Sequence, residues 1–231
     1  MKRKPDYTLY HFHGRVVRHY DAFNHLTSLG LDLLWRRATA RRVARHLKRE
    51  ALVLDVGCGT GDMALAVLRA ASGVTPVGLD PSVEMLERLS MKRRGAALPL
   101  VCAVNPYPFQ PARFDAITGA FVFRNFTRLP ADLEELHRLL RSGGRLYALD
   151  FYRPERLIPH LMLRALESSI VPIIGWLLTG NSAPYRYLCA SIRRFRSAAE
   201  FENILRETGY ADVHRHSFFF GLVNLIVAQK S

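Results

Sequence analysis

Short apolar runs alternate along residues 51–150 with segments whose apolar side chains recur at helical spacing. The runs predict buried strands and the periodic segments predict helices, an alternation typical of a parallel, doubly wound α/β sheet. Ser142-Gly143-Gly144 is expected to close the third helix, because glycine often ends a helix in a left-handed conformation. The predicted strands cover residues 51–56, 74–80, 99–103, 114–121 and 144–150, and the predicted helices cover 62–72, 82–93 and 130–141.

Helical patterns also flank this core. After Tyr20, apolar residues at helical spacing predict a helix that packs on the sheet, and an arginine-rich helix follows with Val43 and Leu47 as its apolar contacts. Residues 157–178 and 185–196 predict a helical insertion over the carboxyl ends of the strands, where open α/β sheets bind ligands. The apolar residues of the first pattern are Leu26, Leu29, Leu33, Leu34 and Trp35.

The C-terminal part is expected to complete the sheet. Residues 198–208 predict a last helix stopped by Gly209, and residues 211–229 predict two strands with Gly221 in or near their turn. The whole pattern predicts a seven-stranded, mostly parallel sheet that ends in an antiparallel hairpin. We expect a single domain, residues 1–231, made of a basic helical cap (1–50), a cofactor-binding α/β core (51–151), a helical insertion (152–196) and a last helix with the terminal hairpin (197–231).

A glycine-rich turn follows the first predicted strand. Gly57, Gly59 and Gly61 occupy alternate positions, and a helix begins directly after them. Glycine tolerates positive φ and lets a ligand approach the main chain, while the first amides of the helix point at that ligand. Asp80 ends the second predicted strand, about 20 residues on, where nucleotide-binding α/β proteins bind ribose hydroxyls. The spacing G-x-G-x-G differs from the G-x-G-x-x-G of dinucleotide sites.

The formal net charge of +13 limits the kinds of partner that the chain is expected to bind. Residues 1–50 hold 12 basic and 4 acidic side chains, a local net charge of +8, which nucleic acid, an anionic membrane or an acidic substrate would each explain. The arginine-rich helix is ordinarily a solvated face, and it could also attract an anionic bilayer at ~1 kcal/mol per basic residue. It lacks aromatic residues spaced for base stacking. Its basic residues are Arg36, Arg37, Arg41, Arg42, Arg45, Lys48 and Arg49.

Other residue types limit the class of protein further. The three cysteines, 58, 102 and 189, have neither paired nor metal-ligand spacing, which indicates a reducing compartment. His11, His13 and His19 have no fourth ligand, so surface histidines are favoured over a metal site. The apolar residues 157–178 are interrupted by charges and prolines and make a poor transmembrane span. No signal-peptide run appears in residues 1–20, so the chain is expected in the cytoplasm.

Three motifs resemble those of the class I methyltransferases, which use S-adenosylmethionine and also end in a hairpin beside a parallel sheet. They are Leu54–Asp62, Asp80–Leu86 and Leu139–Leu146. Further motifs resemble one family in that class, the ubiquinone/menaquinone C-methyltransferases. They are Tyr20-Asp21 with Asn24, Ser28-Leu29-Gly30, Trp35-Arg36, Phe121–Asn125, Asp150–Pro154, Tyr185–Leu188 and Ser191-Ile192. The resemblance runs from about residue 20 to 210.

The resemblance implies a cofactor, a reaction and a set of site residues. Enzymes of this family methylate a ring carbon of a polyprenylated quinol with S-adenosylmethionine. It implies Arg124 near the quinol oxygen, Asn125 on the same oxygen, and Tyr20 closing the pocket. Asp80 would bind the ribose diol, and Asp55 would hold the glycine loop through main-chain amides. The implied cofactor-binding residues are Asp55, Gly57, Gly59, Thr60, Gly61, Asp80, Ala103, Val104 and Ala120.

The chain departs from the family pattern at three places. Ala103-Val104 stands where the family carries a polar adenine contact, Ala120 replaces a small hydroxyl residue, and Ile226-Val227-Ala228 replaces a His-x-Gly. Alternatives therefore stay open: methylation of another small lipophilic acceptor, a degenerate non-catalytic protein of this fold, and nucleic-acid binding, which is not favoured. The partners expected are a polyprenyl quinol and the anionic inner face of the membrane, and a homodimer is left open.

Overall fold

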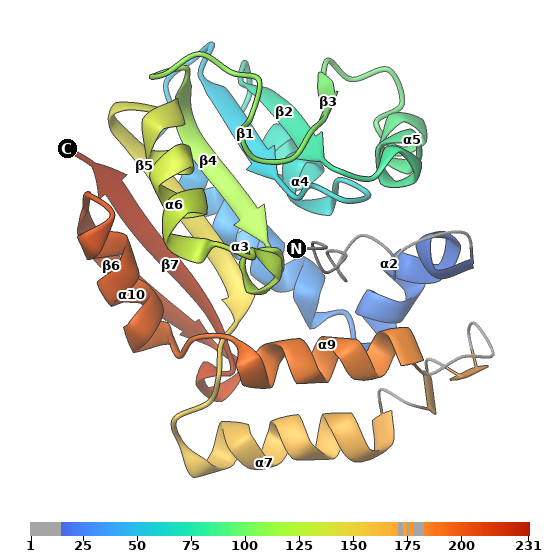
Figure 1. Ribbon diagram of the computed structural model, residues 1–231. Coiled ribbons are helices and arrows are strands. Elements are labelled where there is room, and N and C mark those ends of the chain that lie inside the picture. The colour runs from blue at the N-terminus through green and yellow to red at the C-terminus, as the bar shows by residue number, and fades with distance from the viewer. Residues whose placement is uncertain (1–14, 171–172, 175, 178–182) are drawn as a thin grey trace, which may run out of the picture.

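The computed structural model describes residues 15–170, 173–174, 176–177 and 183–231. His11, His13 and part of the predicted insertion lie outside these residues. Seven strands form one sheet in the order β3-β2-β1-β4-β5-β7-β6 (Figure 1). The first five are mutually parallel, and β7 runs antiparallel between β5 and β6. The strands are β1 (Leu52–Val56), β2 (Thr75–Asp80), β3 (Leu100–Cys102), β4 (Phe114–Ala120), β5 (Leu140–Phe151), β6 (Tyr210–Phe218) and β7 (Val223–Lys230).

This topology confirms the predicted sheet and locates its ligand-binding edge. The chain leaves β1 toward β2 and β3, then returns to β4 on the other side of β1. Ligands of open α/β sheets bind at the carboxyl ends of the strands where the order reverses. That point lies between β1 and β4, so the glycine loop after β1 and the residues after β4 face the expected site.

Helices cover both faces of the sheet because side chains alternate along each strand. Val53 packs with α3 (Leu31–Ala44) and α4 (Asp62–Ala70), whereas Leu54 packs on the opposite face. That opposite face is covered by α6 (Leu129–Leu139) and α10 (Ala198–Glu207), and α5 (Val83–Lys92) packs on β2 and β3.

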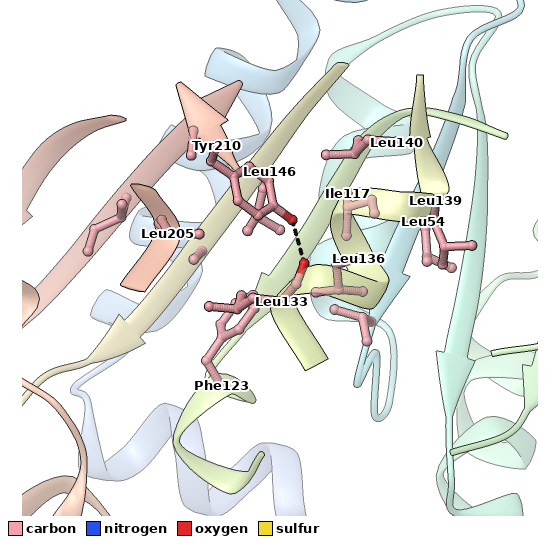
Figure 2. Packing of buried hydrophobic residues seen from close by; sticks show 14 of the residues in the cluster. Leu54, Ile117, Phe123, Leu133, Leu136, Leu139, Leu140, Leu146, Leu205 and Tyr210 are labelled. Carbon is pink, nitrogen blue, oxygen red and sulfur yellow. Dashed lines mark hydrogen bonds between the residues drawn. The ribbon is translucent and has the colours of Figure 1, made fainter. Parts of the chain in front are cut away.

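Figure 2 shows the core on the α6 side, where Leu133 and Leu136 meet Ile117 and Leu146 of the sheet. The Tyr210 hydroxyl donates to the Leu133 carbonyl at 3.1 Å, so its one polar atom is satisfied inside the core. Each buried leucine of this kind contributes about 1.5–3 kcal/mol.

The start of β5 differs from the prediction. Helix α6 already ends at Leu139, and β5 begins at Leu140, which is fully buried and pairs with Phe114. The next pair joins Ala116 to Arg145, so residues 141–144 form a bulge in the strand. The glycines therefore shape a bulge, with Gly143 at φ 75°, and do not close the helix. The C-terminal glycine predictions are confirmed: Gly209 follows α10 at φ 91°, and Gly221 turns the hairpin at φ 89°.

The N-terminal part also corrects the prediction. A turn at residues 28–30 separates α2 (Arg15–Thr27) from α3. Leu26, Leu29 and Leu34 are exposed, so the expected packing on the sheet is wrong for these three. Instead α3 buries a mixed face that consists of Asp32, Trp35, Arg36, Thr39, Ala40 and Val43. Arg36 thus belongs to the interior, and Lys48 with Arg49 lies beyond the end of the helix at Ala44.

A helical insertion follows β5, as expected. It contains α7 (Leu157–Ala165), a π-helical turn (Leu166–Ile170) and α9 (Ala183–Arg194). In Figure 1, α9 lies below the carboxyl ends of β4 and β5, and α7 lies on its far side. Within the residues that the structure describes, no helix is both long and apolar enough to cross a membrane.

Candidate cofactor and acceptor site

The glycine loop between β1 and α4 has all three glycines in the left-handed region, with φ of 60°, 52° and 88°. A Cβ on Gly57 would lie 2.2 Å from Val122, and one on Gly61 would lie 2.0 Å from Leu89. At Gly59, by contrast, the nearest such neighbour is Tyr20 Cε1, 4.0 Å away. Gly57 and Gly61 therefore allow the loop to pack closely against Val122 and Leu89. Gly59 leaves room for a ligand against the main chain.

Asp80 holds this loop at the tip of β2. One carboxylate oxygen accepts the Gly59 amide at 2.8 Å, and the other accepts the Ser82 amide at 2.9 Å. Burial raises the pKa of this carboxyl, and the two amide hydrogen bonds oppose that shift. Each carboxylate oxygen can accept a second hydrogen bond. The arrangement leaves acceptor capacity for two hydroxyl donors, and the ribose contact of Asp80 stays a prediction.

Asp55 is fully buried, and it contacts the main chain in the first turn of the helix that follows the glycine loop. It accepts the Ala64 amide of α4 at 3.0 Å and the Thr118 hydroxyl of β4 at 2.8 Å. Burial raises its pKa to about 7, against the Thr118 hydrogen bond and the positive charge of Arg36. Asp55 thus anchors the first turn of α4, where main-chain amides lack helical partners. The Gly59 amide within the loop is held by Asp80.

The residues that the resemblance places beside the adenine follow β3. Ala103 packs partly against the core, and Val104 is exposed. Asn105, the next polar side chain, donates to Asp132 of α6 at 2.5 Å. Because that amide is directed to α6, we expect the adenine contact to come from the main chain at Ala103 and Val104. Ala120, at the end of β4, packs partly against the α3 side of the core.

A polar network ties the cap helix α2 to the glycine loop. The Thr60 hydroxyl donates to Asp21 at 2.5 Å, and the Lys92 ammonium lies 2.7 Å from Asp21 and 2.9 Å from Asp62. His25 Nε2 lies 3.9 Å from the same Asp62. The sequence did not predict this network, since its members come from three segments that are far apart along the chain. Thr60, predicted to bind cofactor, uses its hydroxyl here to hold α2.

One cluster in this region has metal-ligating side chains. Single ligand atoms of His25, Asp32 and Asp62 lie within 4.8 Å of one another. Two cations already compensate the carboxylates, because Lys92 contacts Asp62 and Arg36 Nε lies 3.8 Å from Asp32. The cluster is therefore better described as an ion-pair network than as a cation site.

A pocket opens beside the loop, under α2 and the insertion, and encloses about 610 Å³ including the part open to solvent. Three aromatic rings form one wall: the ring centroids of Phe121 and Phe151 are 5.3 Å apart, and Trp35 lies 6.2–6.3 Å from both. Leu163, Leu166, Cys189 and Ile192 add apolar surface from the insertion, and Tyr20, Asn24, Thr27, Ser28, Asp32, Arg36 and Arg124 supply polar groups. The lining suits a flat aromatic ligand with few polar atoms.

Arg124 is fixed in this pocket by a buried ion pair. Its NH1 lies 2.5 Å from Asp150, its backbone amide donates to the same carboxylate at 3.3 Å, and Asp150 also accepts the Phe151 amide. Burial raises the pKa of Asp150, and the charge of Arg124 opposes that shift. Arg124 Nε is buried without a hydrogen-bond partner among the described residues. The side chain is therefore oriented and keeps one donor for a ligand.

The structure brings two of the three predicted catalytic residues together. Tyr20 and Arg124 both line the pocket, and Tyr20 also lies over Gly59. Asn125 ends the short turn Phe123–Asn125 and is not part of the lining. Asp150 and Arg36 were missed as site residues. Asp150 is the penultimate residue of β5, and an acid near a strand's carboxyl end was the available signal.

With this geometry in place, comparison with known proteins decides the family. A model of the ubiE/COQ5 methyltransferase family matches residues 1–230. The chain belongs to the ubiE/COQ5 methyltransferase family. The demethylmenaquinone methyltransferase of Deinococcus radiodurans is 36% identical over 218 residues, 93% of this chain and 89% of that protein. The ubiquinone/menaquinone biosynthesis C-methyltransferase UbiE of Rhizobium rhizogenes is 33% identical over 220 residues, 93% of this chain and 85% of that protein.

Solved structures agree on the fold. A SAM dependent methyltransferase from Aquifex aeolicus superposes with a TM-score of 0.60 at 18% identity, covering 84% of this chain and 89% of that chain. The predictions of the family, the class I methyltransferase fold and S-adenosylmethionine as cofactor are confirmed. The residues present fit that cofactor, since Gly59 leaves the loop open and Asp80 keeps acceptor capacity for a diol. The roles of individual residues stay predictions.

Proposed function

We propose that this methyltransferase moves a methyl group from S-adenosylmethionine to a ring carbon of a polyprenylated quinol, of the demethylmenaquinol or ubiquinol-precursor type. The observation that carries the proposal is a buried, oriented arginine in an aromatic pocket whose lining residue Tyr20 also lies over Gly59 of the glycine loop. A quinol ring offers flat apolar faces to the aromatic wall and an oxygen to the arginine. The names of the relatives from D. radiodurans and R. rhizogenes support the same acceptor class.

Arg124 is the residue that acts on the acceptor. A quinol carbon becomes a strong nucleophile only when the neighbouring hydroxyl ionises. The guanidinium stays charged and cannot serve as the base, so it stabilises the developing oxyanion while a water accepts the proton. Asp150 holds the guanidinium in place before the acceptor arrives. Bound S-adenosylmethionine supplies the electrophilic methyl group, and alignment of the two reactants contributes ~7–11 kcal/mol.

A transfer assay tests this function. The purified chain is incubated with ¹³C-methyl S-adenosylmethionine and a short-chain demethylated quinol, kept reduced, or the matching quinone. We expect a carbon-bound methyl group only from the quinol, because the quinone has no hydroxyl to ionise. Arg124→Lys should lower turnover about 100-fold, and Arg153→Lys, at an exposed arginine, should not. An oxygen-bound methyl group, equal labelling of the quinone, or labelling of another lipophilic acceptor alone would overturn the proposal.

We also propose that the chain takes its acceptor from an anionic membrane surface through α7. Pro159 and Leu163 face inward, and Leu163 lines the pocket. The same helix exposes apolar side chains to solvent beside exposed basic residues, a pattern typical of helices that lie in the membrane interface. The exposed apolar residues are Leu157, Ile158 and Leu161, and the exposed basic residues are Arg156, His160 and Arg164. The polyprenyl tail would leave the pocket along this helix.

Liposome flotation tests the surface. The chain should float with vesicles that contain anionic lipid and stay behind with neutral vesicles, because each basic residue near an anionic surface contributes about 1 kcal/mol. Leu157→Gln with Leu161→Gln should reduce flotation while the fold persists, since both side chains are exposed. Leu26→Gln with Leu29→Gln is the matched control, at exposed leucines of the cap. Equal flotation with both vesicle types would contradict the proposal.

A further inference from the structure

Arg36 is a buried arginine with spare hydrogen-bonding capacity. It is 7% exposed, and its Nε has no hydrogen-bond partner among the described residues. The nearest carboxylate is Asp32, 3.8 Å from Nε, which exceeds hydrogen-bond distance. Asp32 is engaged elsewhere, by His25 Nδ1 at 3.0 Å and by the Ser28 hydroxyl at 2.7 Å. The ion pair with Asp32 offsets the charge of Arg36 but leaves the Nε donor without a hydrogen bond, and an unsatisfied buried donor is costly.

Several groups place Arg36 beside the glycine loop. Its guanidinium carbon lies 4.9 Å above the Phe121 ring, and Phe121 directly follows β4. Burial raises the pKa of Asp62, at the end of the loop, but the charges of Arg36 and then Lys92 outweigh burial and hold that pKa below its usual value. Arg36 Nε lies 3.8 Å from Asp32, and a carboxylate oxygen of Asp32 lies within 4.8 Å of one of Asp62. Arg36 therefore lies between the loop and the residue after β4.

The strand order then shows which end of the cofactor would meet Arg36. Asp80 ends β2, on one side of β1, and Phe121 follows β4, on the other side. A ligand that places its ribose at Asp80 and crosses Gly59 must extend its other end toward β4. In S-adenosylmethionine that end is the methionine moiety, which carries an α-carboxylate.

We propose that Arg36 binds the α-carboxylate of the methionine moiety. A carboxylate is the partner that a guanidinium pairs with best, and it would complete the unfilled hydrogen-bonding capacity of this side chain. Arg124 is less suited to this role, because Asp150 already holds it at 2.5 Å. The two buried arginines of the pocket thus have different roles: Arg36 binds the cofactor, and Arg124 contacts the acceptor. The inference rests on the cofactor alone and not on the identity of the acceptor.

Binding calorimetry with two probes tests the proposal. S-adenosylhomocysteine carries the α-carboxylate, and 5′-methylthioadenosine has the same adenosine and sulfur but no amino-acid end. Arg36→Met should weaken S-adenosylhomocysteine about 10- to 100-fold and change 5′-methylthioadenosine less than about 2-fold. Arg36→Lys keeps the charge and should show a smaller loss, again for S-adenosylhomocysteine only. Arg37→Met, at the exposed neighbouring position, should leave both affinities unchanged.

Three results would overturn the inference. Equal losses for both probes in Arg36→Lys would mean that the residue only supports the fold. Unchanged affinity for S-adenosylhomocysteine in Arg36→Met would mean that the carboxylate is bound elsewhere. If the unaltered chain bound neither probe, the cofactor site itself would be contradicted. The quinol assay above would show this independently, as the absence of any methyl transfer.

Discussion

The glycine loop and the acceptor pocket are neighbours built in opposite ways. The loop is local: residues 55–64 and Asp80 shape it, and the main chain supplies its key donors. The pocket is assembled from α2, α3, the turn after β4, the end of β5 and the insertion. Its charged side chains lie in ion pairs, above all Arg124 with Asp150. One region is fixed by backbone conformation, and the other by long-range electrostatics.

This difference explains what substitution should do in each region. In the loop, a side chain added at a glycine meets packed neighbours, so the cost is steric and conformational. In the pocket, removing one partner leaves a buried charge unpaired, so the cost is electrostatic. The two kinds of damage can be measured separately, because each has a control position elsewhere in the chain where a comparable change should cost less.

The largest effect is expected from Asp150→Ala. It leaves the 8%-exposed side chain of Arg124 without its partner and should lower the free energy of unfolding by about 3–5 kcal/mol. Denaturant unfolding measures this. Arg141→Ala removes an ion pair of similar length at the surface, where 46% of the arginine side chain is exposed, and should cost less than about 1 kcal/mol. Equal losses of unfolding free energy in the two variants would show that burial of the Arg124–Asp150 pair contributes nothing to stability.

Gly61→Ala should come next, at about 2–4 kcal/mol, because it combines a left-handed φ with overpacking. The added Cβ would lie 2.0 Å from Leu89, which is fully buried. Gly95→Ala is the matched control: its φ of 81° is similar, and no atom of the described residues lies within 4 Å of the added carbon. Thermal unfolding of the two variants separates the steric part. If Gly61→Ala and Gly95→Ala lose the same stability, close packing of the loop on Leu89 does not contribute to the cost at Gly61.

Asp55→Asn should change the pH dependence of stability. The folded-state pKa of about 7 lies above the model-compound value of 3.8, so this carboxyl stabilises the fold at low pH and that contribution is lost as the pH rises toward 7. Asparagine does not titrate. The stability of the variant relative to the original chain should therefore rise by up to about 1 kcal/mol per pH unit between pH 5 and 7. Denaturant titrations at several pH values would contradict this if the difference stays constant.

The smallest effect is expected from Lys92→Met, which removes the link between Asp21 of the cap and Asp62 of the loop. The pair is partly exposed, so global stability should change by less than about 1 kcal/mol. Hydrogen exchange should nevertheless become faster in α2 and stay unchanged in the sheet, since the link acts on the cap alone. Arg88→Met, on the same helix and outside the network, is the control. Unchanged exchange in α2 would show that the network does not hold the cap.

The same contrast explains what could be predicted from the sequence. The first four strands, the glycine loop and the place of Asp80 at the end of β2 follow from patterns within 30 residues, and the structure has these elements where they are expected. The exposure of Leu26 and Leu29 could not be predicted, because helical spacing does not reveal the break at Gly30. Arg36 looked like part of a solvated basic face, and only the packing of Phe121 and the loop around it shows otherwise. Long-range ion pairs leave no local signal.

The separation between the two regions can be tested most directly by measuring cofactor affinity in one variant of each. Asp80→Asn should weaken S-adenosylmethionine binding in calorimetry at least about 10-fold, because it disturbs both the Gly59 amide and the ribose contact. Arg124→Lys should keep that affinity within about 3-fold, since lysine can still pair with Asp150, while quinol turnover falls. Equal loss of cofactor affinity in both variants, or retained affinity in Asp80→Asn, would contradict the account.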